Sequence, residues 1–202
     1  MDIQSRFERL VDLVVDRKSE FNSFLDFLRN ETVYFSTPAS TRFHLCREGG
    51  LFEHSVNVAE TMLRLKGILA PEVSDESCVI VALFHDLGKA GMPGNPQYLK
   101  NEPSDKEKVY GYEPKYPYSF NNNLTYLSVP VRSLYLALQF LPLSEEEVQA
   151  IVYHDGQYVE DNRGVATKEE KLTLLLQYSD NWSGFILEKE EKCYTQNNPR
   201  KC

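Results

Sequence analysis

The sequence predicts a protein built mainly of helices, and two observations support this prediction. Apolar residues recur every three or four positions in roughly five or six separate segments, which is the spacing of amphipathic helices. Capping boxes, in which a hydroxyl and a carboxylate cap the first helical turn, occur at Ser144–Glu147 and Thr167–Glu170. The 202 residues, of which 42% are hydrophobic and 26% are charged, suffice for one globular domain with a sizeable core.

The charge of the chain limits the partners that we expect it to bind. Lys and Arg number 22 against 30 Asp and Glu, so the formal net charge is -8. An acidic surface disfavours binding to long nucleic acid because it repels the phosphates, whereas a local basic site can still accept a small anionic substrate. No apolar stretch approaches the roughly 20 residues of a membrane span, and the N-terminus lacks a signal-peptide core. We therefore expect a cytoplasmic protein without a membrane partner.

The first segment with helical spacing covers residues 3–28. Its apolar stripe has a period near 3.6 residues and is interrupted by the charged run Asp16, Arg17 and Lys18. The stripe therefore predicts either one long helix or two short helices, with a role in core packing only.

Two histidines follow in neighbouring segments. Residues 36–50 are rich in turn formers and end in a glycine pair, which predicts an irregular lead into the next helix. His44 in this lead is open to three interpretations, as a metal ligand, a substrate contact or a plain surface histidine. His54 lies on the apolar stripe of a helix expected over residues 51–69. Taken alone, such a histidine is more often a satisfied core residue than a ligand.

A second apolar helix ends in a His-Asp doublet. Ser74 can cap its start, Gly88 can end it in the left-handed conformation, and the last inward-facing turn carries His85 and Asp86. An imidazole and a carboxylate in the interior are costly unless a partner satisfies them. A divalent cation would satisfy both side chains.

The long segment 91–123 has no regular periodicity and is rich in Pro, Gly, Tyr and Asn. A loop of this length in a compact domain is usually functional or disordered, and its tyrosines argue against disorder. We therefore expect a lid over the functional site, with a structural flap as the alternative. Within this lid, Lys100, Tyr110 and Lys115 are candidate substrate contacts.

The C-terminal half contains further helical segments. One is entered at Pro130 and runs to residue 141, and its Arg132 is another candidate substrate contact. The last one places Asp180 on a buried stripe, so that an acid again interrupts an apolar face. Residues 191–202 are expected to form a charged, frayed tail.

Between these two helices, residues 144–156 repeat the pattern of an apolar helix that ends in His, Asp and Gly. The second doublet consists of His154 and Asp155. It is either functional or only a polar helix end with a glycine stop at Gly156.

Three helices thus each carry a polar defect toward the interior, namely His54 on one, His85 with Asp86 on another, and Asp180 on a third. One shared metal ion explains all of them. Two imidazoles and two carboxylates, with positions left open for water, suit Mn, Fe, Co, Ni or Mg better than a closed structural zinc site. We expect one divalent ion, either one of these five or Zn. Such an ion activates water and polarises a phosphoryl oxygen, and Lys89 can neutralise charge on the phosphate.

These motifs resemble the HD-domain superfamily of metal-dependent phosphohydrolases, whose pattern is a histidine, a His-Asp doublet and a distant aspartate. The string GGLFEH that ends at His54 looks like the first motif, HDLGK from His85 to Lys89 like the central doublet, and YSD that ends at Asp180 like the last ligand. The resemblance extends from residue 38 to residue 182. It implies an all-α bundle in a single domain, residues 1–202, with its core at 38–190.

The resemblance also implies a function. The expected protein is a phosphohydrolase with one metal ion that cleaves a phosphate ester or anhydride of a nucleotide-like small molecule through a metal-activated water. The implied metal ligands are His54, His85, Asp86 and Asp180; the catalytic candidates are Asp86, Lys89, His154 and Asp155; and the candidate substrate contacts are His44, Lys89, Lys100, Tyr110, Lys115 and Arg132.

The chain departs from known branches of this superfamily in several places. Dinuclear relatives add histidines after the doublet, but none occurs here between Asp86 and His154, and Asp155 stands where a second histidine is often found. We therefore expect His154 and Asp155 to serve substrate or water. The 5′-deoxynucleotidase-like branch carries Glu where this chain has Lys89. The string PASTRFH that ends at His44 also looks like the HD domain of a bacterial 3′-to-5′ exoribonuclease group. Those enzymes carry an additional nucleic-acid-binding domain, for which we expect 202 residues to be too few.

Two alternatives to the hydrolase prediction stay open at this point. The first is a regulatory domain that retains the metal and binds a nucleotide without turnover. The second is a nuclease that acts on short oligonucleotides. Binding and hydrolysis need the same cation, so the ligand set alone does not separate them.

Overall fold

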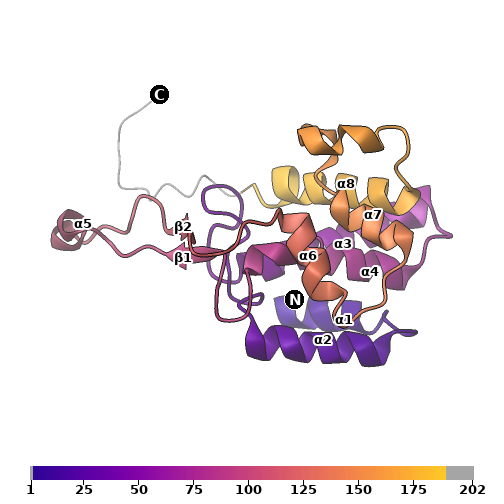
Figure 1. Ribbon diagram of the computed structural model, residues 1–202, viewed down its shortest axis with the longest axis horizontal. Coiled ribbons are helices and arrows are strands. Elements are labelled where there is room, and N and C mark those ends of the chain that lie inside the picture. The colour runs from indigo at the N-terminus through magenta and orange to yellow at the C-terminus, as the bar shows by residue number, and fades with distance from the viewer. Residues whose placement is uncertain (1, 190–202) are drawn as a thin grey trace.

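The computed structural model of the protein describes residues 2–189, and the tail expected at residues 191–202 lies outside this range. The described chain forms eight α-helices, a few 3-10 or π segments and one small sheet (Figure 1). The helices are α1 (Ile3–Val11), α2 (Lys18–Glu31), α3 (Gly50–Leu69), α4 (Asp75–Phe84), α5 (Asp105–Tyr110), α6 (Val129–Ala137), α7 (Glu145–Val152) and α8 (Lys171–Trp182). The 3-10 segments are η1 (Leu87–Ala90), η2 (Gly156–Tyr158) and η3 (Glu160–Val165). The all-α class predicted from the sequence is therefore confirmed.

The N-terminal stripe forms two short helices, α1 and α2, rather than one long helix. In the break between them, the N–H groups of Val15 and Asp16 donate to Glu76 Oε2 at 2.7 and 2.8 Å. The guanidinium of Arg17 donates to Glu76 and to Glu147. The charged run that interrupts the apolar pattern thus forms a turn, whose polar groups bind the first turns of α4 and α7.

Helix α3 packs against α1, α4 and α8 and carries His54. The glycine pair determines how the chain enters it, because Gly49 has a φ of 74° and a Cβ on Gly50 would lie 2.0 Å from the carbonyl oxygen of Leu45. Only glycine permits so close an approach. The preceding loop therefore passes close to the start of α3, and the rings of His44 and His54 come to lie 5.0 Å apart.

Helix α4 starts where the sequence predicts, since the hydroxyl of Ser74 accepts a hydrogen bond from the first turn. The left-handed stop expected at Gly88 is wrong, because Gly88 does not have a positive φ, whereas the next glycine along the chain, Gly91, has a φ of 80°. Gly88 lies in η1, where an added Cβ would stand 2.3 Å from the carbonyl oxygen of Val129. This glycine is therefore required by the close approach of α6, not by helix termination.

The capping signals of the C-terminal half are only partly correct. At the start of α7, the hydroxyl of Ser144 accepts from the N–H of Glu147 at 3.2 Å, and the Glu147 carboxylate accepts from the N–H of Ser144 at 2.8 Å. This capping box is confirmed. The box expected at Thr167 and Glu170 is wrong, because Thr167 has a φ of 67° and the Glu170 side chain makes no cap. Pro130 lies in the first turn of α6, as predicted.

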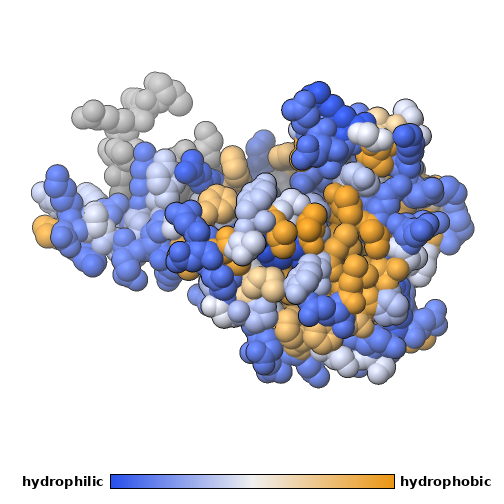
Figure 2. Space-filling view, in the orientation of Figure 1, coloured by the Kyte–Doolittle hydropathy of each residue, from blue (hydrophilic) through white to orange (hydrophobic). Residues whose placement is uncertain are grey.

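Residues 91–123 form a projecting arm that is more ordered than the irregular loop expected. In this arm β1 (Tyr98–Lys100) pairs antiparallel with β2 (Tyr118–Phe120), and α5 lies at the tip, away from the helical body (Figure 1). Figure 2 shows mostly hydrophilic side chains on the visible face of the arm. Its role as a lid stays a prediction.

One hydrophobic cluster joins the helices of the body. Phe84, the last residue of α4, is fully buried and contacts the rings of Phe21 and Phe24 at centroid distances of 5.7 and 4.8 Å. This packing fixes the end of α4 and hence the position of His85, the next residue. Within residues 2–189, no helix has the length and apolar character that crossing a membrane requires.

Candidate metal centre

His54 is the central side chain of a buried cluster of histidines and carboxylates. It projects from α3 and is almost fully buried. Its Nε2 atom lies 3.0 Å from Asp180 Oδ1, on α8, and 3.7 Å from Asp86 Oδ2, after α4. Three elements that are far apart in the sequence thus meet at one imidazole edge.

His85 and His154 have the same local arrangement. His85 comes one residue after the end of α4, and His154 comes two residues after the end of α7. In each, Nδ1 lies 2.8 Å from the carbonyl oxygen three residues earlier, that of Ala82 for His85 and that of Ile151 for His154. Because a carbonyl oxygen only accepts, Nδ1 donates a proton there. In the neutral ring, the lone pair on Nε2 then faces the centre of the cluster. The two rings are 4.7 Å apart.

Two carboxylates complete the cluster. His85 Nε2 lies 3.5 Å from Asp86 Oδ2 and 3.8 Å from Asp180 Oδ1, and His154 Nε2 lies 3.5 Å from Asp86 Oδ1. The donor atoms of His54, His85 and Asp86 all lie within 4.8 Å of one another, and so do those of His85, His154 and Asp180. The structure therefore brings together the four side chains predicted as ligands and adds the imidazole of His154.

The residues present fit a divalent cation. His85 Nε2 is buried and has no hydrogen-bond partner in the described part of the chain, and a nitrogen in that state is costly unless something satisfies it. Asp86, Asp180 and Glu188 surround the histidines, whereas one nearby ammonium group, that of Lys89, contacts Asp86 at 2.5 Å. Neutral imidazoles and carboxylates of this kind are the ligands that Mn, Fe, Co and Ni accept.

Charge within the cluster shifts the pKa of several groups. Burial alone would raise the pKa of Asp86, but Lys89 and His85 lower it well below its usual range. Burial alone would lower the pKa of His54 and of His154. Hydrogen bonds to Asp180 and Glu188 instead raise the pKa of His54 to about 10, and the hydrogen bond to Asp86 raises that of His154 to about 9. Without a metal, both rings are therefore imidazolium cations, with a proton on each nitrogen, near neutral pH.

This protonation predicts that metal affinity rises with pH. To bind at His54, a cation would have to displace a proton from its ring, and a raised pKa means that this proton is bound tightly until the pH approaches that value. We expect the apparent affinity for Mn²⁺ to rise up to about tenfold per pH unit between about pH 6 and about pH 8. Calorimetric titration in buffers of different ionisation enthalpy measures the protons released. An affinity that stays constant over this range would contradict the prediction.

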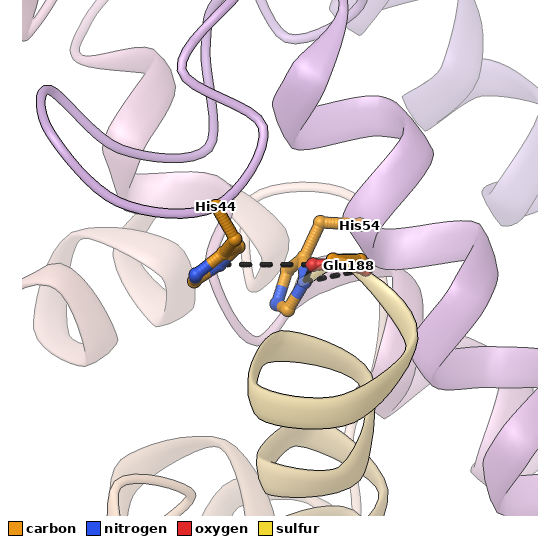
Figure 3. A group of neighbouring side chains, drawn as sticks. All are labelled: His44, His54 and Glu188. Carbon is orange, nitrogen blue, oxygen red and sulfur yellow. Dashed lines mark hydrogen bonds and ion pairs between the residues drawn. The ribbon is translucent and has the colours of Figure 1, made fainter. Parts of the chain in front are cut away.

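Glu188 belongs to the cluster although the sequence did not indicate it. Residues Ser183–Leu187 form a π turn, in which the N–H of Glu188 donates to the carbonyl oxygen of Ser183 at 2.9 Å. At about 100° per residue, an unbroken α-helix would rotate Glu188 about 80° away from the direction of Asp180. The wider π turn brings it back to the side of His54. Figure 3 shows its carboxylate joined by dashed lines to both His54 and His44.

A pocket of about 320 Å³ opens onto the cluster. Its wall includes five of the predicted catalytic and substrate-binding residues, His44, Asp86, Lys89, His154 and Asp155. The wall also includes five residues that the sequence analysis missed, among them Tyr158, Asn181 and Phe185. Tyr158 is only four residues beyond His154, which is the one signal in the sequence that pointed to it.

The remaining candidate substrate contacts lie elsewhere. Lys100, Tyr110 and Lys115 are exposed on the arm, and none of them is among the described residues that line this pocket. Arg132 is buried, and its guanidinium donates to the side chain of Gln97 and the carbonyl oxygen of Thr125, both at 2.7 Å. It lines a neighbouring pocket of about 610 Å³.

Comparison with known families agrees with this geometry. The family model of the HD domain matches residues 51–178, a range that contains His54, His85, Asp86 and His154 and ends just before Asp180. No curated protein and no solved structure matches the chain. HD domains bind divalent metals and belong to a superfamily of metal-dependent hydrolases. Because the match covers more than half of the chain, this protein belongs to the HD domain family.

Proposed function

We propose that this protein is a phosphohydrolase that cleaves a phosphate ester or anhydride of a nucleotide-like small molecule with the help of one divalent metal ion. The observation that carries the proposal is the buried, unpartnered Nε2 of His85, which faces two carboxylates at the base of an open pocket. Membership of the HD domain family supports the same conclusion.

The residues that would hold the ion are His54, His85, Asp86 and Asp180, and His154 lies close enough to add a further nitrogen. When bound there, a divalent ion lowers the pKa of a coordinated water and polarises a phosphoryl oxygen. The two carboxylates would supply the negative charge that retains the ion. The imidazoles would favour first-row transition metals over Mg²⁺ or Ca²⁺.

Two side chains of the protein would act on the substrate and on water. Lys89 would neutralise phosphate charge, and Asp155 would take part in proton transfer. Burial alone would lower the pKa of Lys89, but Asp86 and Tyr98 raise it, so the amine stays protonated and can neutralise phosphate charge. The Asp155 side chain is 47% exposed, lines the pocket and lies 3.7 Å from His154 Nε2. A carboxylate in this position can orient a water molecule or accept its proton.

The surroundings of the pocket support a substrate of nucleotide size. The 320 Å³ pocket and the 610 Å³ pocket share Val129 and Asp155, so a ligand can extend from one into the other. Tyr158 is 91% exposed and Phe185 is 67% exposed, and both line the smaller pocket. Exposed aromatic rings beside a phosphate site offer stacking surface for a base.

The test is a turnover assay with the full chain loaded with Mn²⁺ or Co²⁺. Nucleoside mono-, di- and triphosphates, a cyclic nucleotide and a short oligonucleotide are each incubated with enzyme, and products are separated by chromatography. We expect release of phosphate or pyrophosphate from at least one mononucleotide, lost in Asp86→Ala. Tight nucleotide binding without turnover would favour the regulatory alternative, and cleavage of the oligonucleotide alone would favour the nuclease.

We predict that Lys89→Ala lowers kcat/KM by roughly 10²- to 10³-fold, because one cationic contact to a transferring phosphate contributes about 2 to 4 kcal/mol to transition-state stabilisation. Metal content should stay near one ion per chain, since an amine that pairs with Asp86 competes with the ion rather than holding it. Lys171→Ala is the matched control, because that lysine pairs with Glu72 on the surface. Wild-type kinetics in Lys89→Ala would remove this residue from the mechanism.

Three wider features belong to the same proposal. Among residues 2–189, one hydrophobic cluster joins the helices, which supports the proposal of one domain over residues 1–202. The lack of further histidines between Asp86 and His154 supports one ion per chain. A cytoplasmic location follows the expectation from the sequence.

A further inference from the structure

We propose that Glu188 is a positioning residue that fixes the orientation and proton position of His54 and thereby tightens metal binding. This inference rests on the proposed metal centre. It assigns a role to a carboxylate that lies at Nδ1 of His54, whereas Asp86 and Asp180 lie at Nε2 on the opposite side of the ring.

Glu188 contacts His54, a proposed metal ligand, at the ring nitrogen that points away from the proposed ion. Its two oxygens lie 2.9 and 3.1 Å from His54 Nδ1, and the opposite ring nitrogen, Nε2, lies 3.0 Å from Asp180 Oδ1. Glu188 is itself buried and accepts a hydrogen bond from Asn57 Nδ2 at 2.8 Å. Two side chains of α3, those of His54 and Asn57, thus hold this carboxylate in place, and Figure 3 shows the contact with His54.

His54 differs in this respect from the other two imidazoles. The Nδ1 atoms of His85 and His154 donate to backbone carbonyl oxygens, whereas that of His54 donates to a carboxylate. An anion behind the ring fixes the tautomer with the proton on Nδ1 and makes Nε2 a stronger electron-pair donor. His54 should therefore be the imidazole that binds the ion most strongly.

The same three side chains do not make a second metal site of their own. His44, His54 and Glu188 offer donor atoms within 4.8 Å of one another. However, a neutral imidazole has only one lone pair on nitrogen. If His54 Nδ1 bound an ion beside Glu188, Nε2 would carry the proton and could not bind the ion beside Asp86 and Asp180. One imidazole therefore serves one site, and Glu188 acts through it.

The experiment compares Glu188→Gln and Glu188→Ala with wild type in the full chain. The dissociation constant for Mn²⁺ is measured by competition with a chelator, the metal content by elemental analysis and the stability by thermal unfolding. We expect affinity to weaken about 10-fold in Glu188→Gln and up to about 100-fold in Glu188→Ala, the range typical of outer-shell partners of metal ligands. Saturation with excess metal should still give one ion per chain.

Glu60→Gln is the matched control. Glu60 lies on α3, the helix that carries His54, is partly buried and accepts two hydrogen bonds from Arg6 at 3.2 and 2.9 Å. Its replacement should lower the melting temperature without changing the Mn²⁺ dissociation constant. Loss of affinity in Glu188→Gln, but not in Glu60→Gln, separates positioning of His54 from general loosening of the fold. If Glu188→Ala fails to fold, Glu188→Gln alone decides the outcome.

Two results would overturn the inference. One is a wild-type dissociation constant in Glu188→Gln. The other is a metal content of two ions per chain in the wild type and of one ion per chain in Glu188→Gln, which would make Glu188 a ligand. Either failure is distinguishable from failure of the proposed metal centre, which would appear as full metal content in His85→Ala or Asp86→Ala.

Discussion

Replacement of Asp86 by alanine is expected to empty the metal centre and to abolish hydrolysis. The carboxylate lies 3.5 Å from the Nε2 atoms of both His85 and His154 and 3.7 Å from that of His54, so it is the group that touches all three imidazoles. Removing it takes away one formal charge where a divalent ion must be held. We expect metal affinity to fall by at least about 100-fold and turnover to fall to background. Elemental analysis and the nucleotide assay measure both effects.

Two further variants make this result interpretable. His85→Ala should also empty the site, because its buried Nε2 faces Asp86 and Asp180 and has no hydrogen-bond partner in the described part of the chain. Asp155→Asn should lower kcat but keep one ion per chain, because that carboxylate is half exposed and lies at the edge of the cluster. Full metal content in Asp86→Ala would show that the site is misassigned. A content of two ions that falls to one in Asp155→Asn would contradict the single-metal proposal.

The second large effect concerns stability. Replacement of Arg17 by alanine is expected to lower the free energy of unfolding by about 3 kcal/mol, near the lower end of the range for breaking buried ion pairs, because Arg17 is partly exposed. Its guanidinium donates to Glu76 at 2.6 Å and to both oxygens of Glu147 at 2.7 and 2.8 Å. The side chain of Glu147 is only 2% exposed, so it would be left as a buried charge without its partner.

Urea unfolding of paired variants tests this prediction. Arg17→Lys should also be destabilised, because an ammonium group cannot donate to two carboxylates with the geometry of a guanidinium. Arg29→Ala is the control, since its ion pair with Asp26 is exposed, and we expect a change below about 0.5 kcal/mol. A loss in Arg17→Ala no larger than in this control would mean that solvent already screens the buried network.

The arrangement of the helices and the main motifs followed from local rules. Apolar spacing predicted α3, α4 and α8, and the polar exceptions on these stripes, His54 and Asp180, come to lie 3.0 Å apart in the structure. Local rules work here because each helix has one buried face, and a polar residue on that face must point toward the other helices. The role of these side chains as metal ligands stays a prediction.

Features that depend on contacts between distant segments were not predictable in the same way. Gly88 looked like a helix stop, but the reason for glycine there is the backbone of Val129, which is 41 positions later in the chain. Glu188 was hidden by the π turn, since helical spacing does not continue through an extra residue. The arm pairs Tyr98 with Phe120 across a long connection, and neither short strand has enough residues to show an alternating pattern.

The matching ends of α4 and α7 have an electrostatic consequence that does not depend on any side chain. Both helices deliver their histidine from the C-terminal end, where aligned peptide dipoles leave a partial negative charge of roughly half an electron. Because the rings of His85 and His154 lie only 4.7 Å apart, both ends lie near the cluster, and the backbone field there favours a cation by about 0.3 to 1 kcal/mol for each helix. The preference for positive charge is thus a property of the fold, and it persists when an individual ligand is replaced.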